Sequence, residues 1–171
     1  LLASLVGNTL NVVLPEGVRL ADVPPARRRP EMEFHFSLAP ARVDDVLAQL
    51  HAHGLVEERQ GFGTRERLEG LMTGFIDLVY EHDGRYYLLD YKSNQLPDYG
   101  DDALADAIAH SEYDLQYLLY TVALHRWLGF RLPGYRYDRH FGGVRYLFCR
   151  GLQAGRADSP GVFASLPPRA L

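Results

Sequence analysis

The feature that most constrains this fold is the pair Asp83-Gly84, which lies between two runs rich in aromatic and β-branched residues. An Asp-Gly pair in that setting is the strongest short-range signal of a β-hairpin. In a two-residue turn, or a four-residue turn centred on the same pair, counting back along both strands places Asp77 opposite Asp90. A three-residue bulged turn would shift this pairing by one residue. The symmetric register therefore predicts two carboxylates that face each other across the hairpin.

Two facing carboxylates need an explanation, because like charges opposite each other destabilise a sheet. A shared proton or a bound cation would relieve the repulsion. Mg²⁺ is often held by one or two carboxylates together with water and substrate phosphate oxygens. Lys92 follows Asp90 by two residues and so lies on the same side of the strand. An ammonium there would orient the attacking water or stabilise developing charge, which indicates metal-assisted hydrolysis of a phosphodiester.

The Asp-x-Lys tripeptide by itself carries little information, and an exposed ion pair beside a hairpin explains it equally well. Composition favours the catalytic interpretation. The chain contains 18 lysine and arginine residues in total. Lys92 is the only lysine, and all the others are arginine. Lysine offers a compact ammonium whose pKa shifts readily on burial, which arginine does not match.

Three motifs in order resemble a known family: Gly74-Phe75-Ile76-Asp77, then Asp90-Tyr91-Lys92-Ser93, then Gln116 followed four residues later by Tyr120. Together they resemble the PD-(D/E)XK nuclease superfamily, and most closely its RecB-like nuclease domains. The likeness covers 31–151 and is dense from Gly70 onward. It implies an α/β fold with a mixed central β-sheet flanked by helices, the restriction-endonuclease-like core.

The resemblance also implies roles for particular residues. The cofactor would be Mg²⁺, with Mn²⁺ or Ca²⁺ able to occupy the same site. The expected ligands are Asp77, Asp90, the backbone carbonyl of Tyr91 and, from the first strand, Glu31. Gln116 and Tyr120 would contact the DNA strand, although amphipathic packing explains the same stripe of the helix without any function.

The family further implies exonucleolytic DNA hydrolysis within a RecBCD-type helicase–nuclease that processes double-strand breaks for recombinational repair. Partners would be DNA, RecC-like and RecD-like subunits and the helicase portion of the same chain. In RecB-like nucleases a histidine from an upstream helix also ligates the metal. No histidine precedes Glu31 here, so we expect weak metal binding and low activity from this chain alone.

Two other functions remain open at this stage. One is a nuclease-fold scaffold that binds DNA or docks subunits without chemistry, which would not need Asp77, Asp90 and Lys92. The other is a stand-alone PD-(D/E)XK endonuclease, which the RecB-like stretch over 113–143 argues against.

Composition limits the partners and the compartment. The net charge of −4 excludes a uniformly basic nucleic-acid coat. The single cysteine, Cys149, excludes a disulfide framework and a four-cysteine iron–sulfur cluster, and indicates a reducing compartment. No apolar run has the length of a membrane span. We expect a cytoplasmic, nucleoid-associated bacterial protein.

Periodicity and turn residues divide the chain into a connector over 1–30, a nuclease core over 31–151 and a loosely ordered tail over 152–171. Within the connector, Arg27–Arg29 form a solvated basic run or contact backbone phosphates. Expected elements, in order, are a helix tail over 1–14, a strand over 31–38, a helix over 40–53 with Pro40 in its first turn, a loop or irregular hairpin over 55–69, the central hairpin, a helix over 102–110, a helix from 111 or 112 to 128 that Gly129 ends, and a final strand over 144–149.

Overall fold

A five-stranded sheet with strand order β1-β2-β3-β4-β5 forms the centre of the molecule. The structure is a computed structural model that describes residues 1–61 and 66–169. The helices are α1 (Leu2–Asn11), α2 (Val43–Ala52), α3 (Asp101–His110), α4 (Tyr113–Arg131) and α5 (Tyr137–His140), with short 3-10 turns η1 (Leu20–Asp22) and η2 (Pro25–Arg27). The strands are β1 (Arg28–Arg42), β2 (Arg67–His82), β3 (Arg85–Lys92), β4 (Phe141–Phe148) and β5 (Val162–Ser165). This is the mixed sheet flanked by helices that the motifs predict.

The central hairpin has the predicted register. Strands β2 and β3 are antiparallel, and their pairs run from His82↔Arg85 to Leu78↔Leu89. Asp83 and Gly84 have φ values of 50° and 76°. Positive φ at both central residues is characteristic of the type I′ turn, whose twist matches that of the flanking strands.

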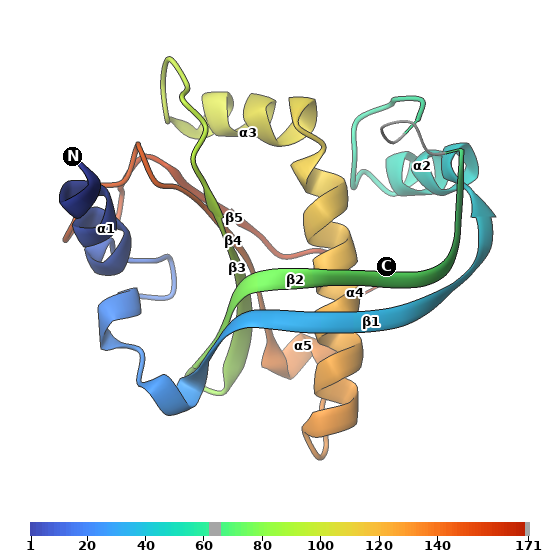
Figure 1. Cartoon of the computed structure of the whole chain (residues 1–171), viewed down its shortest axis with the longest axis horizontal. Helices are drawn as coiled ribbons and strands as arrows, with labels where there is room; N and C mark the ends of the chain where they lie inside the picture. The colour runs from blue at the N-terminus through green and yellow to red at the C-terminus, as the bar shows by residue number, and fades with distance from the viewer. Residues whose placement is uncertain (62–65, 170–171) are drawn as a thin grey trace.

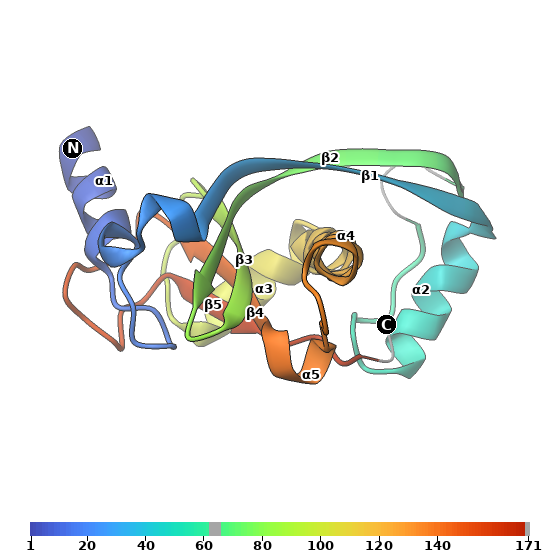
Figure 2. The ribbon, with the colours of Figure 1, turned by 90° about the horizontal axis from the view of Figure 1, so that it is seen from below.

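Strand β2 leaves β3 beyond Leu78 and continues as the partner of β1 as far as Arg67. The resulting two-stranded antiparallel ribbon of β1 and β2, whose strands are connected through α2, arches across α4 (Figures 1 and 2). Glu31 lies at the bend, between the pairs Pro30↔Leu78 and Met32↔Ile76, and has a left-handed φ of 49°. Because β2 separates from β3 at this point, the edge of β3 next to Asp90 has no strand partner on that side.

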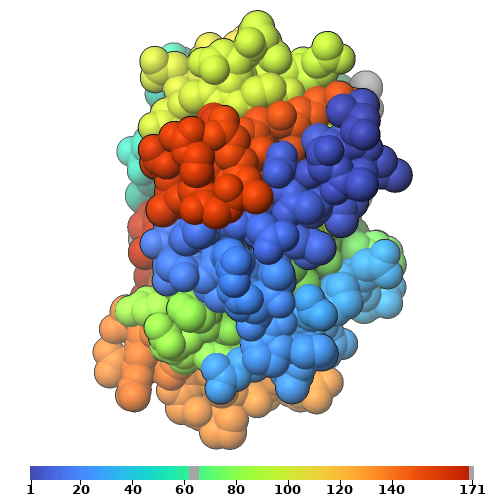
Figure 3. Space-filling model, turned by 90° about the vertical axis from the view of Figure 1, so that its left-hand side faces the viewer, coloured from blue at the N-terminus to red at the C-terminus, as the bar shows by residue number. Residues whose placement is uncertain are grey.

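Strands β3 and β4 are parallel, and the crossover between them contains α3 and α4. Helix α4 packs on one face of the sheet and buries leucines against Leu88, Val144 and Phe148. The opposite face is covered by N-terminal residues, among them Val12 and Leu14, in a second core with Leu89 and Leu147. Figure 3 looks onto this covered side, where N-terminal and C-terminal segments meet.

Several boundaries differ from the sequence prediction. The helix predicted over 40–53 begins at Val43, and Pro40 lies in β1. Pro40 falls where the register of β1 against β2 shifts, between Leu38 and Ala41, and a bulge tolerates a residue without an N–H. Helix α4 continues through Gly129 to Arg131. Tertiary packing of its last turn, with Leu128 buried, outweighs the intrinsic cost of about 1 kcal/mol for one glycine.

The expectations for the two ends of the chain also need correction. Residues 152–171 are not a loose tail throughout, because Val162–Ser165 form β5 and pair with β4, which is therefore not the final strand. The connector expected over 1–30 contributes buried side chains to the core. Glu16 anchors it, since its carboxylate accepts hydrogen bonds from Arg145 and Tyr80 of the sheet. Part of the loop expected over 55–69 lies outside the described residues, and 67–69 belong to β2. Of the helices in the described segments, none has the length and apolar character needed to cross a membrane.

Candidate active site

The two predicted aspartates meet where β2 departs from β3. The ladder stops one pair before them, at Leu78↔Leu89. The Oδ2 atom of Asp77 accepts a hydrogen bond of 3.0 Å from the backbone N–H of Tyr91. Asp90 follows Leu89 and is 5% exposed, and its carboxyl group interacts with that of Asp77. The side chain of Asp77 thus replaces the strand partner that Tyr91 lacks.

Lys92 projects to the same side of β3 as Asp90, as alternation predicts. Its Nζ atom lies 2.5 Å from Asp90 Oδ2 and donates a hydrogen bond of 2.8 Å to Gln116 Oε1. It also lies 3.8 Å from the ring centroid of Tyr113 and 4.7 Å from that of Tyr146. The Lys92 residue is 8% exposed, so a carboxylate, an amide oxygen and two aromatic faces replace the hydration of its ammonium.

Gln116 links this ion pair to α4. Its Oε1 atom accepts hydrogen bonds from Lys92 and, at 2.8 Å, from the Tyr146 hydroxyl. Its Nε2 atom donates to the Tyr120 hydroxyl at 3.1 Å. The structure therefore brings together Asp77, Asp90, Lys92, Gln116 and Tyr120, as the motifs predict. The amide oxygen of Gln116 is occupied by the protein, which leaves the Tyr120 O–H free to donate outward.

The electrostatics of the aspartate pair favour a bound cation. Burial raises the pKa of the Asp90 carboxyl, Lys92 acts in the opposite direction, and Asp77 raises it further. A divalent ion beside the two carboxylates would stabilise their charged forms. Their oxygens are the hard ligands that Mg²⁺ prefers. The residues present therefore fit such an ion.

Glu31 lies between the pairs Pro30↔Leu78 and Met32↔Ile76, and so falls opposite Asp77 in the register of β1 with β2. Its side chain is exposed, and its backbone is at the bend of β1. Across residues 1–61 and 66–169, no three His, Cys, Asp or Glu side chains are grouped closely enough to hold an ion by themselves. The protein ligands gathered here are the two aspartates, with any further ones to come from the backbone, water or substrate. Glu31 as a ligand stays a prediction.

Tyr146 was missed by the sequence analysis. It faces Asp90 in the parallel pairing of β3 with β4 and is fully buried. Its hydroxyl fixes Gln116, and its ring covers Lys92. No local signal reveals this contact, because a crossover that contains α3, α4 and α5 separates the two strands.

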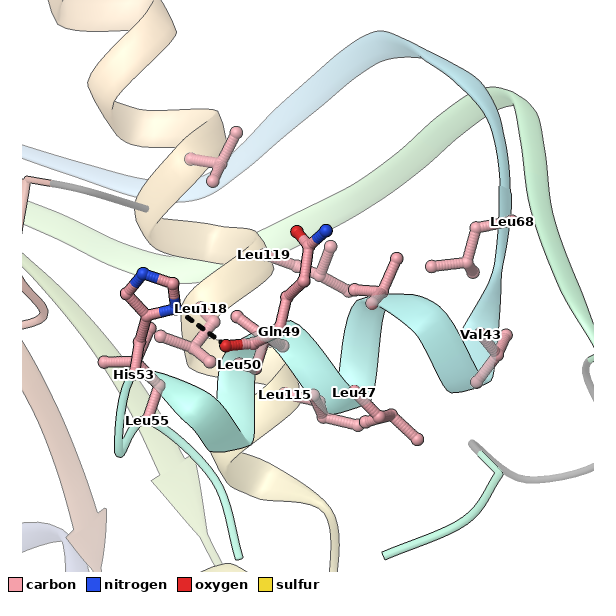
Figure 4. Close-up of a pocket in the computed structure, with 12 residues that line it drawn as sticks. Val43, Leu47, Gln49, Leu50, His53, Leu55, Leu68, Leu115, Leu118 and Leu119 are labelled. Atoms are coloured by element: carbon pink, nitrogen blue, oxygen red, sulfur yellow. Dashed lines mark hydrogen bonds between the residues drawn. The ribbon is translucent and has the colours of Figure 1, made fainter. Parts of the chain in front are cut away.

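An apolar hollow lies elsewhere, between α2 and α4 (Figure 4). It encloses about 280 Å³ and is lined mainly by leucine and valine side chains. Its polar lining residues are Gln49 and His53, and His53 Nδ1 is 2.8 Å from the Gln49 carbonyl oxygen. The lining has no carboxylate, so it offers no alternative centre for hydrolysis.

Comparison with known proteins decides the family. The model of the PD-(D/E)XK nuclease superfamily matches residues 17–158. The chain belongs to this superfamily. The match crosses both boundaries predicted at 30 and 151, so the matched region is wider than the core expected from the motifs.

Curated relatives named RecBCD enzyme subunit RecB are similar over most of this chain. The protein of Haemophilus influenzae is 45% identical over 159 residues, which cover 88% of this chain and 13% of the relative. The Escherichia coli protein is 39% identical over 163 residues, or 91% of this chain and 14% of the relative. The Mycolicibacterium smegmatis protein is 34% identical over 191 residues, or 92% and 18%. The chain thus spans less than a fifth of the length of these relatives.

Proposed function

We propose that this chain is the nuclease domain of a RecBCD-type enzyme and hydrolyses DNA phosphodiester bonds with Mg²⁺. One observation carries the proposal: a buried ammonium lies 2.5 Å from one of two adjacent carboxylates, at an open strand edge. Superfamily membership and the names of the relatives support it. By the same analogy we propose RecC-like and RecD-like subunits and a helicase portion as partners.

Asp77 and Asp90 would hold the metal ion, and the Tyr91 carbonyl is a suitable further ligand. Residues of an antiparallel pair exchange both N–H and C=O bonds, so the N–H and C=O of Tyr91 point to the same edge. Its N–H bonds to Asp77 because β2 has turned away. The carbonyl of Tyr91 therefore points to the edge that β2 has left. When bound, the ion lowers the pKa of a coordinated water and neutralises charge on the phosphate.

Lys92 would act on the water and on the phosphate. An ammonium has three donors, and Asp90 and Gln116 take two of them. The third faces the rings of Tyr113 and Tyr146, and would turn to orient a water oxygen or to stabilise a phosphate oxygen as negative charge grows. In the reaction the water oxygen forms a bond to phosphorus and the water proton passes to solvent, while the P–O bond to the leaving oxygen breaks and that oxygen takes up a proton from solvent. Gln116 and Tyr146 hold Lys92 in place, and the Tyr120 hydroxyl is free to donate to the strand.

The test is cleavage of a labelled linear DNA by a full-length enzyme that contains this chain, as wild type and with Lys92→Gln or Asp90→Asn, in the presence of Mg²⁺ or Mn²⁺. We expect either variant to lower the rate at least 100-fold, the scale of about one electrostatic or acid–base contribution. Asp138→Asn is the matched control, because Asp138 forms an exposed ion pair with Arg136. Circular dichroism establishes that each variant is folded. Wild-type rates from a folded Lys92→Gln or Asp90→Asn protein would refute the proposed roles.

A further inference from the structure

The elements at one end of the molecule, at the bottom of Figure 1, carry several arginines that have no ion-pair partner among the described residues. This end is formed by η2, the first residues of β1, the C-terminal half of α4, and α5. The arginines of this cluster are exposed, and in the described part of the chain none of them forms an ion pair: Arg28, Arg29, Arg126, Arg131 and Arg139. The chain as a whole carries a net charge of −4. The positive charge at this end is therefore local, because the whole chain has no excess of basic over acidic residues.

A groove of about 350 Å³ opens at this end, between residues 26–29, residues 79–81 of β2, Tyr86 and Trp127. The Arg29 guanidinium lies 5.5 Å from the ring centroid of Trp127, which is only half-buried. Arg27 is bound to Glu81 at 3.3 Å. Among the described residues that line the groove, this pairing leaves Arg28 and Arg29 as the charges without an ion-pair partner, beside an accessible aromatic ring.

The groove is close to the aspartate pair. Val79 in its wall follows Asp77 by two residues in β2, a rise of about 7 Å. Trp127 follows Tyr120 by seven residues in α4, or about 10 Å along the helix axis. Each nucleotide of a strand advances about 3.4 Å along a DNA helix. The groove and the site are thus separated by about two or three nucleotides.

We propose that this groove binds the phosphate backbone of the DNA strand two or three nucleotides from the bond that is cleaved. Arg28 and Arg29 contact phosphate oxygens, and Trp127 offers a face on which a base stacks. Basic side chains next to an aromatic platform are the combination that recognises single strands without sequence preference. The inference rests on the proposed function and adds a second contact region to it.

The experiment measures binding of a fluorescent single-stranded oligonucleotide to the 171-residue chain by anisotropy, at several salt concentrations, with Ca²⁺ in place of Mg²⁺. The variant is Arg28→Gln with Arg29→Gln. Two lost phosphate contacts lower the slope of log K against log salt by about 1.4, because each contributes about 0.7 on a single strand. The matched control, Arg19→Gln with Arg156→Gln, removes the same charge from exposed arginines that are paired with aspartates. Its slope stays at the wild-type value.

Trp127→Leu separates stacking from charge, since it weakens binding without changing the slope. An unchanged slope in the Arg28/Arg29 variant, an equal fall in the control, or no measurable DNA binding by the wild-type chain overturns the inference. Asp90→Asn distinguishes it from the proposed function, because this variant is expected to lose cleavage whether or not the groove binds DNA. If cleavage depends on Asp90 while the variant Arg28→Gln with Arg29→Gln keeps the wild-type slope, the proposed DNA-binding role of the groove is refuted and the proposed function stands.

Discussion

Glu16→Ala tests how the N-terminal segment is attached to the sheet. Glu16 Oε2 lies 3.0 Å from Arg145 Nε, and the side chains of Arg145 and Glu16 are 8% and 6% exposed. The second carboxylate oxygen accepts a hydrogen bond from the Tyr80 hydroxyl. The Arg145 guanidinium also lies 4.9 Å from the ring centroid of Tyr87. Removing Glu16 leaves a guanidinium and a phenol buried without their acceptor.

The expected cost is large because the remaining charge stays buried. Breaking a buried ion pair by removing one partner costs about 3–5 kcal/mol, and the orphaned Tyr80 hydroxyl adds about 1–3 kcal/mol where it finds no water. We expect Glu16→Ala to lower the free energy of unfolding by about 4 kcal/mol. Domains of this kind have about 5–15 kcal/mol in total, so the variant approaches the limit of folding.

Urea unfolding followed by circular dichroism measures the effect. The control is Asp22→Ala, which breaks the exposed pair with Arg19 at a cost of about 0–1 kcal/mol. Glu16→Leu with Arg145→Met removes both charges and should recover most of the loss, because apolar pairs often replace buried ion pairs well. Equal midpoints for Glu16→Ala and Asp22→Ala would refute the reasoning.

Other parts of the molecule give three further predictions. Gly142→Ala would place a methyl group 2.4 Å from the Tyr87 ring and should lower the free energy of unfolding by about 1–3 kcal/mol. In Gly129→Ala the new methyl group has its nearest neighbour at 3.8 Å, so the better helix propensity of alanine should raise the free energy of unfolding by up to about 1 kcal/mol. Thermal unfolding of the two variants checks both predictions. Burial raises the pKa of Tyr120 to about 12, above the value of about 10 in an unfolded chain. The neutral side chain of Tyr120 therefore contributes fully to the free energy of unfolding below about pH 10, and this contribution is lost as the pH rises towards about 12. Urea midpoints should fall between these two pH values, together with the appearance of tyrosinate absorbance. Calorimetric titration with Mg²⁺ should show weak binding, since fewer than three acidic, histidine or cysteine side chains are grouped at any one place in the described residues. Asp77→Asn should abolish the heat, and micromolar affinity of the wild-type chain would contradict this.

The sequence predicted the local part of the site well. Asp83-Gly84 determines the turn, and alternation along two short strands then brings Asp77, Asp90 and Lys92 together. The four-residue spacing of Gln116 and Tyr120 predicted that both side chains lie on the same face of one helix. Each of these relations depends on neighbours within one hairpin or one helix, where period and turn chemistry suffice.

The non-local part could not be obtained in this way. The register between β3 and β4 depends on how α3 and α4 pack, so the position of Tyr146 over Lys92 has no signature in the sequence. The same holds for Glu16, whose partner Arg145 is 129 residues away. Strand β5 has only four residues and is recognisable only by its pairing with β4.

The sequence separations of the site's contacts imply an order of assembly. Asp77 and Tyr91 are 14 residues apart, Lys92 and Gln116 are 24 apart, and Gln116 and Tyr146 are 30 apart. Closing a longer loop costs more entropy, and a chain emerges from the ribosome with its N-terminal part first. The acids therefore meet early, and the lysine gains the ring of Tyr146 only after the fourth strand has docked. A nascent chain that stops short of that strand would present the acidic pair with a lysine that has the ring of Tyr113 but lacks this second aromatic face.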